Sequence, residues 1–237
     1  IPTTYAGSEM TPILGQTEDG VKTTQRTMKV LPEVVIYDVD LTLTLPIALS
    51  VTSGINAMAH AIEALYAENR NPVISMLAEE GIRALYRTLG IISDKPSDIK
   101  VRSDALFGAW LCGTSLGSVG MALHHKLCHT LGGTFDLPHA ETHTVLLPHV
   151  TAFNAVAVPE LDALGHKLNG TSLAVSIAEL AKRAGAPLSL DAIGMPKDGL
   201  DRAAELAVSN PYFNPRTFSQ GDIRELLENA FHGTSLE

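Results

Sequence analysis

The pattern of apolar and polar positions divides the chain into two parts of unequal length. In residues 1–45, the short apolar run 34–38 follows Pro32 and is bounded by turn residues, so it predicts a buried β-strand. From Pro46 onward the pattern is that of successive helices. The sequence therefore predicts a short α/β segment, residues 1–45, followed by an all-α domain, residues 46–237.

Capping residues mark several of the expected helices. Ser53 is a predicted N-cap for a helix that runs to residue 67. Asn71 with Pro72 predicts the start of the next helix, and Gly90 its end. The other expected helices are one that carries the first histidines and ends at Gly132–Gly133, and three at 172–183, 200–208 and 221–231.

Residues 105–123 form a stretch without any charged side chain. Its length alone would allow it to span a membrane. Glycines and hydroxyl residues dilute its apolar character, however, and no second such stretch accompanies it. We therefore expect a buried helix, whose small residues let neighbouring helices approach closely.

Charge and cysteine content limit the partners and the location. The chain has 237 residues and a formal net charge of −9. Nucleic-acid binding needs a basic face, so no nucleic-acid partner is expected, and an anionic membrane surface is disfavoured for the same reason. Two cysteines, Cys112 and Cys128, are too few for a disulfide framework and suit a reducing compartment. With no recognisable signal peptide, the sequence predicts a cytoplasmic protein.

Five of the nine histidines lie between positions 124 and 143. Because residues four apart share a face of a helix, His125 and His129 are expected to point the same way. Asn56 and His60 have the same spacing on an earlier expected helix, and His139 follows the double glycine. Imidazoles from two helices and a loop are thus able to converge on one site. Taken singly, a residue such as His60 is more often a hydrogen-bonded core histidine than a ligand.

Three stretches resemble motifs of the iron-containing, or group III, alcohol dehydrogenase family. They are PTTYAGSE at 2–9, SGINAMAHAIE at 53–63, and MALHHKLCHTLGG followed by LPHAE between 121 and 141. Three motifs in the family's order, spread over nearly the whole chain, make the resemblance specific. Within that family, Asn56 in place of a metal-binding Asp, the paired His124 and His125, KLCH and PHAETH resemble the maleylacetate reductase branch.

The resemblance implies a dehydroquinate-synthase-like architecture, in which a dinucleotide-binding α/β domain precedes a helical domain, usually within a homodimer. Residues 1–45 would then be the last strands of the dinucleotide-binding domain, and 46–237 the helical substrate and metal-site domain. The glycine-rich phosphate loop of the family has no counterpart in these residues, so this stretch by itself is expected to be inactive.

The resemblance also implies roles for individual residues. The positions of the family's metal ligands are Asn56, His60, His125 and His139, and the position of its histidine beside the nicotinamide is His129. The cofactor-contacting threonines correspond to Thr3 and Thr4, and Lys22 is a further candidate for cofactor binding.

The implied activity is reduction of the carbon–carbon double bond of maleylacetate to 3-oxoadipate in the degradation of aromatic compounds, with NADH or NADPH. Hydride addition to this conjugated bond places negative charge on an enolate oxygen, so the site needs a hydrogen-bond donor and an acid. His129 is the first candidate for the acid, followed by the three histidines at the metal positions. His124 and Lys126 are expected to bind the carboxylates of the small dicarboxylate substrate, the alternative being that both are simply solvated.

Asn56 stands where the family has its one anionic metal ligand. An amide oxygen is a poorer donor, so iron or zinc is expected to be weakly held or absent, although His60, His125 and His139 can still bind zinc. Two alternative functions stay open: a metal-dependent alcohol dehydrogenase with unusual ligands, and a non-catalytic helical metal-binding module.

Overall fold

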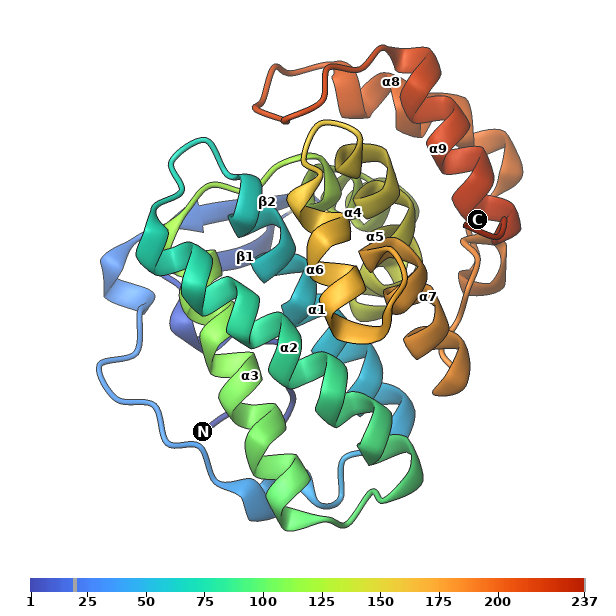
Figure 1. Cartoon of the computed structure of the whole chain (residues 1–237). Coiled ribbons are helices and arrows are strands. Elements are labelled where there is room, and N and C mark those ends of the chain that lie inside the picture. Colours follow the sequence, from blue (N-terminus) through green and yellow to red (C-terminus); the bar gives the residue numbers. More distant parts are fainter. Residues whose placement is uncertain (19–20, 237) are drawn as a thin grey trace. The chain divides into compact units, whose positions relative to one another are not determined.

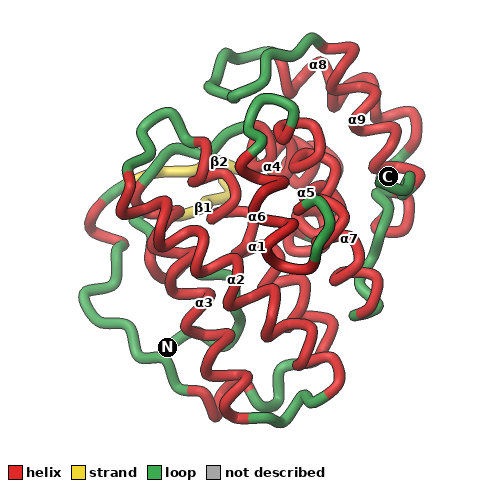
Figure 2. Tube along the Cα trace, viewed as in Figure 1, coloured by secondary structure: helices red, strands yellow, loops and turns green. Residues whose placement is uncertain are grey.

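The structure is a computed structural model that describes residues 1–18 and 21–236, without the side chains of 16–24 (Figure 1). The chain forms two compact units. The first unit contains Ile1–Leu65 and Asn69–Gly120, and the second contains Tyr66–Glu68 and Met121–Glu237. Helices make up most of both units, as Figure 2 shows, which confirms the mostly helical fold expected from the sequence. The predicted division at residues 45 and 46 concerns the family's domains and stays a prediction.

The first unit joins a β-hairpin to three long helices. Strands β1 (Ile13–Glu18) and β2 (Val21–Arg26) pair antiparallel, with Ile13 opposite Arg26. Helices α1 (Ile47–Tyr66), α2 (Pro72–Asp94) and α3 (Ile99–Ser118) follow, and short 3₁₀ turns occupy Ser8–Met10, Met28–Val30 and Val39–Thr42. Arg26 donates a hydrogen bond from Nη2 to the carbonyl oxygen of Gly117 over 2.9 Å, which fastens the hairpin to α3.

The strand predicted at residues 34–38 is wrong. This run is a loop, and two of its apolar side chains are largely exposed, Val34 at 76% and Ile36 at 55%. Within the described residues the sheet consists of β1 and β2 alone, so the run has no strand beside it to share backbone hydrogen bonds. Tyr37 instead donates its hydroxyl proton to Glu9 Oε1 over 2.8 Å.

Three expected helix boundaries show where local signals in the sequence succeed and fail. Asn71 caps α2 as predicted, because its side chain accepts a hydrogen bond from the Ile74 backbone N–H over 3.1 Å. Gly90 does not end α2; it is buried within the helix. Ser53 is not an N-cap either, because α1 begins at Ile47, directly after Pro46. The Ser53 hydroxyl donates back to the Leu49 carbonyl oxygen over 2.6 Å inside the helix.

Small residues on α3 permit the close packing expected from the sequence. A Cβ atom on Gly108 would lie 2.9 Å from Leu85 Cγ, and one on Gly113 would lie 2.3 Å from the Gly7 carbonyl oxygen. Both distances are too short for a side chain, so glycine is required there. No single described helix is long and apolar enough to cross a membrane, although α3 and the helix after it, Leu123–Phe135, pass together on length and composition alone.

The second unit is an all-helical body around its own hydrophobic core. Its helices are α4 (Leu123–Phe135), α5 (His139–Ala155), α6 (Glu160–Asn169), α7 (Leu173–Arg183), α8 (Leu200–Val208) and α9 (Gln220–His232). The last three match the expected helices to within a residue. Helix α4 does not end at Gly132–Gly133, however; it runs to Phe135, and Asp136 after it adopts the left-handed conformation with φ 54°. Helices α5 and α6 were not predicted. Because α5 begins at His139, this residue lies at the start of a helix and not in the expected loop.

Candidate functional site

Helix α4 carries two neighbouring stripes of reactive side chains. His124 and Cys128 are four positions apart and form one stripe, and His125 and His129 form the next. The first stripe faces the core, since His124 is 0% and Cys128 1% exposed. The second runs outward, from His125 at 6% to the exposed His129. The ring centroids of His125 and His129 lie 6.1 Å apart, so the expectation that they point the same way is confirmed.

Helix α5 adds two histidines from its first turns. His139 is its first residue and is exposed, and His143, one turn later, is completely buried. The ring of His143 meets three others at centroid distances of 4.8 Å to His124, 5.1 Å to His125 and 4.5 Å to His139. His143 therefore lies at the centre of a histidine cluster, which we define as His124, His125, His129, His139 and His143.

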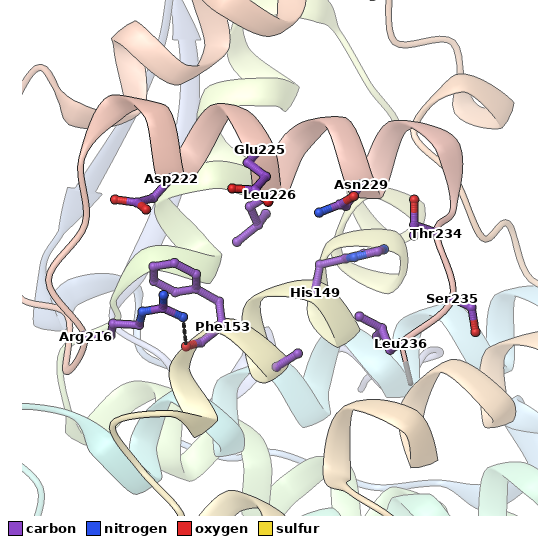
Figure 3. Close-up of a pocket in the computed structure, with 11 residues that line it drawn as sticks. His149, Phe153, Arg216, Asp222, Glu225, Leu226, Asn229, Thr234, Ser235 and Leu236 are labelled. Atoms are coloured by element: carbon purple, nitrogen blue, oxygen red, sulfur yellow. Dashed lines mark hydrogen bonds between the residues drawn. The ribbon is translucent and has the colours of Figure 1, made fainter.

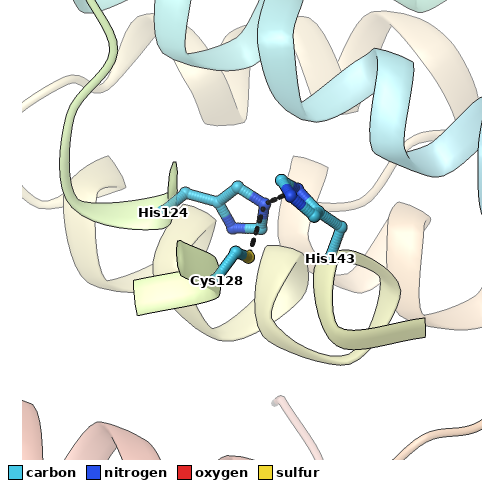
Figure 4. Close-up of side chains that lie close together, drawn as sticks. All are labelled: His124, Cys128 and His143. Atoms are coloured by element: carbon cyan, nitrogen blue, oxygen red, sulfur yellow. Dashed lines mark hydrogen bonds between the residues drawn. The ribbon is translucent and has the colours of Figure 1, made fainter. Parts of the chain in front are cut away.

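His124 occupies a different environment from the one expected. Its Nε2 lies 2.8 Å from His143 Nδ1 and 3.5 Å from Cys128 Sγ (Figure 4). Burial holds the pKa of His124 well below its ordinary value, and the neighbouring histidines His125, His129 and His139 lower it further. A neutral, fully buried imidazole supplies no positive charge to a carboxylate. Both the anchoring role expected for His124 and the solvated alternative are therefore corrected.

Lys126 is the cation that the sequence placed beside the cluster. Its side chain is half-buried, and its ammonium lies 5.9 Å from the centroid of the Tyr212 ring. Such a contact attracts the ammonium electrostatically and orients it. Of the two expected carboxylate anchors, Lys126 alone has a side chain suited to the role.

Asn56 and His60 lie on helix α1 in the first unit. Both are almost fully buried, at 4% and 5% exposure. His60 Nε2 lies 3.2 Å from the carbonyl oxygen of Ala6. A carbonyl oxygen can only accept, so this nitrogen carries the proton. The Asn56 Oδ1 atom is buried and has no hydrogen-bond partner among the described residues.

The metal ligands expected from the sequence lack the carboxylate of the family's site. The set offers no carboxylate, and the proton on His60 Nε2 faces a backbone carbonyl, so this nitrogen cannot also donate a lone pair. A second grouping, His124, Cys128 and His143, has potential ligand atoms within 4.8 Å of one another. Two nitrogens on a tetrahedral zinc ion would lie roughly 3.3 Å apart, given zinc–nitrogen distances of about 2.0–2.1 Å. The observed 2.8 Å between His124 and His143 is that of a hydrogen bond.

The stretch expected to contact the cofactor has accessible threonines followed by a buried, hydrogen-bonded tyrosine. Thr3 is exposed and Thr4 half-buried. Tyr5 follows, fully buried, and its backbone N–H donates to Ser53 Oγ over 3.2 Å. Two accessible hydroxyls on a fixed backbone suit the binding of a polar cofactor. Lys22 lies on β2, opposite Thr17, but its side chain is outside the described part of the structure.

A separate cavity of about 280 Å³ in the second unit contains none of the predicted site residues (Figure 3). It lies between α5 and α9, and its lining includes His149, Phe153, Arg216 and Asn229. Arg216 stacks on the Phe153 ring at 3.9 Å and donates to the Phe153 carbonyl oxygen. Burial lowers the pKa of His149 to about 4. Its lining also includes the carboxyl side chains of Asp222 and Glu225, and none of the histidines of the cluster lines it.

The sequence reading missed the central residue of the cluster. The sequence analysis assigns no role to His143, which the structure places among three other histidine rings. In PHAETH, His139 and His143 are four residues apart, and on a helix this spacing places both on one face. A helix start after Pro138 was therefore the signal that would have joined His143 to the site.

Comparison with known proteins places the chain among dehydrogenases. Residues 50–231 match the C-terminal part of the Fe-containing alcohol dehydrogenase family. The chain is 57% identical to the maleylacetate reductase of Sphingobium indicum, over 98% of this chain and 66% of that protein. It is 58% identical to the maleylacetate reductase of Rhizobium sp. strain MTP-10005, over 100% of this chain and 68% of that one. A crystal structure of maleylacetate reductase from Agrobacterium tumefaciens superposes with a TM-score of 0.94 at 60% identity, over 98% of this chain and 66% of its own. The chain thus spans 66 to 68% of the length of these relatives.

Proposed function

Because this chain belongs to the Fe-containing alcohol dehydrogenase family, we propose that it forms the helical part of a maleylacetate reductase. The proposed enzyme reduces the carbon–carbon double bond of maleylacetate to 3-oxoadipate with NADH or NADPH. The observation that carries the proposal is identity of 57 and 58% to two maleylacetate reductases over at least 98% of the chain. The histidine cluster supports it, because this reaction needs hydrogen-bond donors and an acid.

Lys126 and the exposed histidines supply the binding groups. The substrate is a small dicarboxylate, and the protein is acidic, with a net charge of −9. A local cation is therefore needed to bind a carboxylate, and the Lys126 ammonium, oriented by Tyr212, provides it. His129 and His139 are the members of the cluster whose side chains are exposed, and so they are open to a ligand.

The chain's residues act on the charge that the reaction creates. Thr3 and Thr4, with Lys22, would hold the nicotinamide cofactor, which when bound would supply hydride for the end of the double bond distant from the ketone. The electron pair of the double bond then resides on the ketone oxygen as an enolate, which His125 and His139 stabilise as hydrogen-bond donors. His129 donates a proton to the neighbouring carbon and completes the reduction.

His60 is a weaker candidate for a donor. Its Nε2 proton is directed at the Ala6 carbonyl oxygen, so this proton is engaged in holding the cofactor-binding stretch. We assign it a place in the site through that contact. No step of the proposed reaction uses a metal, in keeping with the poor fit of Asn56 and His60 to a divalent ion.

The setting proposed for the intact enzyme follows the family resemblance. We propose a homodimer in the cytoplasm, with neither a nucleic acid nor a membrane as partner. Both cysteines, Cys112 and Cys128, are buried free thiols, which is consistent with a reducing compartment.

The decisive experiment follows NADH and NADPH oxidation by the intact enzyme on maleylacetate, with oxidation of ethanol and a diol measured in parallel and bound metal determined. The proposal expects turnover of maleylacetate by a preparation without stoichiometric metal. Metal-dependent oxidation of the alcohols without reduction of maleylacetate would favour the alcohol dehydrogenase alternative. No turnover in any assay would favour the non-catalytic module.

A further inference from the structure

Two buried histidines join α4 to α5 beneath the exposed members of the cluster. His124 and His143 are both 0% exposed, and their Nε2 and Nδ1 atoms lie 2.8 Å apart (Figure 4). Cys128 Sγ lies 3.5 Å from the same His124 nitrogen, as a weaker third member. None of these three side chains has a role in the reaction proposed above.

The hydrogen bond fixes the rotation of the His143 ring. An imidazole can turn about its last side-chain bond, and that torsion has broad energy wells. A 2.8 Å hydrogen bond from a completely buried partner restricts this torsion and couples the tautomers of the two rings, because one of the two nitrogens must donate and the other accept. The His143 ring therefore has a fixed orientation, and neighbouring rings can pack against it.

His143 contacts the two histidines proposed to stabilise the enolate. Its ring meets His139 at a centroid distance of 4.5 Å and an angle of 64°, and His125 at 5.1 Å and 69°. His139 is exposed whereas His143 is completely buried, so His143 lies on the protein side of that contact. Such a contact restricts the orientation of an exposed imidazole, whereas solvent imposes none.

We propose that His143, held by His124, is a positioning residue that orients the rings of His125 and His139 for catalysis. The inference rests on the proposed function for its kinetic consequence. The structural part of the inference does not depend on the substrate: His143, held by His124, sets the orientation of the other two rings. Hydrogen-bond donors act on a transition state only when they are already aimed at the atom where charge develops, and a misplacement of about 1 Å costs roughly 10²-fold in rate.

The test is a double-substitution cycle in the intact enzyme with His124→Phe, His143→Phe and both together. Phenylalanine keeps a buried ring and removes the hydrogen bond. We expect each single variant to lower kcat on maleylacetate by about 10- to 100-fold with an unchanged KM for NADH. The double variant should be no slower than the slower single variant, because both substitutions break one interaction. Independent, multiplying losses would overturn the proposal, as would a folded His143→Phe enzyme with wild-type kcat.

The matched control is His149→Phe, the same substitution in another buried histidine of α5. His149 is 7% exposed and belongs to the separate cavity, so its variant should keep wild-type kcat. If it loses as much rate as His143→Phe, the effect comes from disturbing the helix and the proposal fails. Should His143→Phe not fold, His143→Asn retains a hydrogen-bonding group toward His124 and is expected to recover part of the rate.

Two readouts separate this inference from the proposed function and from a metal site. The NMR signals of the imidazole nitrogens and of the carbon-bound ring protons report the environment of each histidine ring, and they can be measured in the absence of substrate. Those of His125 and His139 should shift in His143→Phe and stay in place in His149→Phe, even if maleylacetate proves not to be the substrate. Unshifted signals would overturn the inference. Stoichiometric zinc that is lost in Cys128→Ser would also overturn it, because the triad would then be a metal site.

Discussion

The Arg102 guanidinium donates a hydrogen bond from Nη1 to the hydroxyl of Tyr5 over 3.1 Å, and both side chains are completely buried. The same guanidinium donates to the carbonyl oxygens of Pro96 at 2.8 Å and Leu45 at 3.1 Å, and to Ser50 Oγ at 2.8 Å. Within the described residues no carboxylate comes within ion-pair distance of it. One buried cation, surrounded by neutral oxygens, thus ties the N-terminal stretch around Tyr5 to α1 and to the start of α3.

Removing this cation should destabilise the first unit strongly. Arg102→Leu leaves several buried oxygens without donors, each costing about 1–3 kcal/mol, so we expect a loss of at least about 3 kcal/mol in the free energy of unfolding. Tyr5→Phe removes one acceptor of a charged donor and should cost roughly 1.5–3 kcal/mol. Urea unfolding followed by circular dichroism measures both. A loss below about 1 kcal/mol for Arg102→Leu would show that water replaces these contacts.

A glycine pair tests the close approach of the N-terminal stretch to α3. Gly113→Ala would place a Cβ atom 2.3 Å from the Gly7 carbonyl oxygen, so we expect a loss of about 1–3 kcal/mol or more in stability. Gly133→Ala is the matched control on α4, because a Cβ atom there meets nothing within 4 Å in the described structure. Alanine favours a helix over glycine, so the control should gain up to about 1 kcal/mol. Equal melting temperatures for the two variants would contradict the close approach of the N-terminal stretch to α3.

Local signals in the sequence predicted the helices whose ends are set by nearby residues. Asn71 before Pro72 caps α2 because the interaction spans only three positions. Ser53 failed as a cap because α1 begins earlier, at Ile47, and inside the helix the Ser53 hydroxyl instead accepts from the Tyr5 backbone N–H, 48 positions away. Such long-range contacts leave no local pattern. The double glycine at 132 and 133 misled for a related reason, since the packing of α4 in the second unit holds the helix together beyond it.

The candidate site was predicted in the same uneven way. The spacing of His125 and His129 placed both on one face of a helix, and the structure confirms it. The charge state of His124 was not readable, because burial depends on what packs around α4. His143 required knowing that α5 begins at His139, and without this boundary the spacing of the two had no meaning.

His149 should make the second unit sensitive to mild acid. Burial lowers its pKa from 6.5 to about 4 in the folded protein. Between these values the unfolded chain binds a proton that the folded protein does not, so stability falls as pH is lowered from 6.5 towards 4. Above pH 6.5 the residue contributes no pH dependence. The total loss is on the order of 3 kcal/mol. His149→Phe should flatten the dependence of urea midpoints on pH in this window, and an unchanged slope would contradict the assignment.

Metal dependence can be tested at Asn56. Treatment with a chelator should leave reductase activity of the intact wild-type enzyme largely unchanged, because the expected ligand set Asn56, His60, His125 and His139 contains no carboxylate. Asn56→Asp restores a carboxylate and should raise zinc or iron affinity by roughly 10-fold or more, measured by calorimetry. Asn56→Ala is the control and should not raise it. Tightly bound metal in the wild type, with activity lost on its removal, would show that the amide oxygen of Asn56 suffices as a ligand.

The most direct test of the proposed chemistry is the removal of His129. If this side chain donates the proton that completes the reduction, His129→Ala should lower kcat by about 10²–10⁴-fold while NADH affinity changes little. Because His129 is exposed, its loss should cost little stability, so circular dichroism and thermal melting should match the wild type. His166→Ala removes another exposed histidine of the second unit and should keep normal kcat. A folded His129→Ala enzyme with near-normal kcat would exclude His129 as the acid. The proton would then have to come from His139, the other exposed member of the cluster.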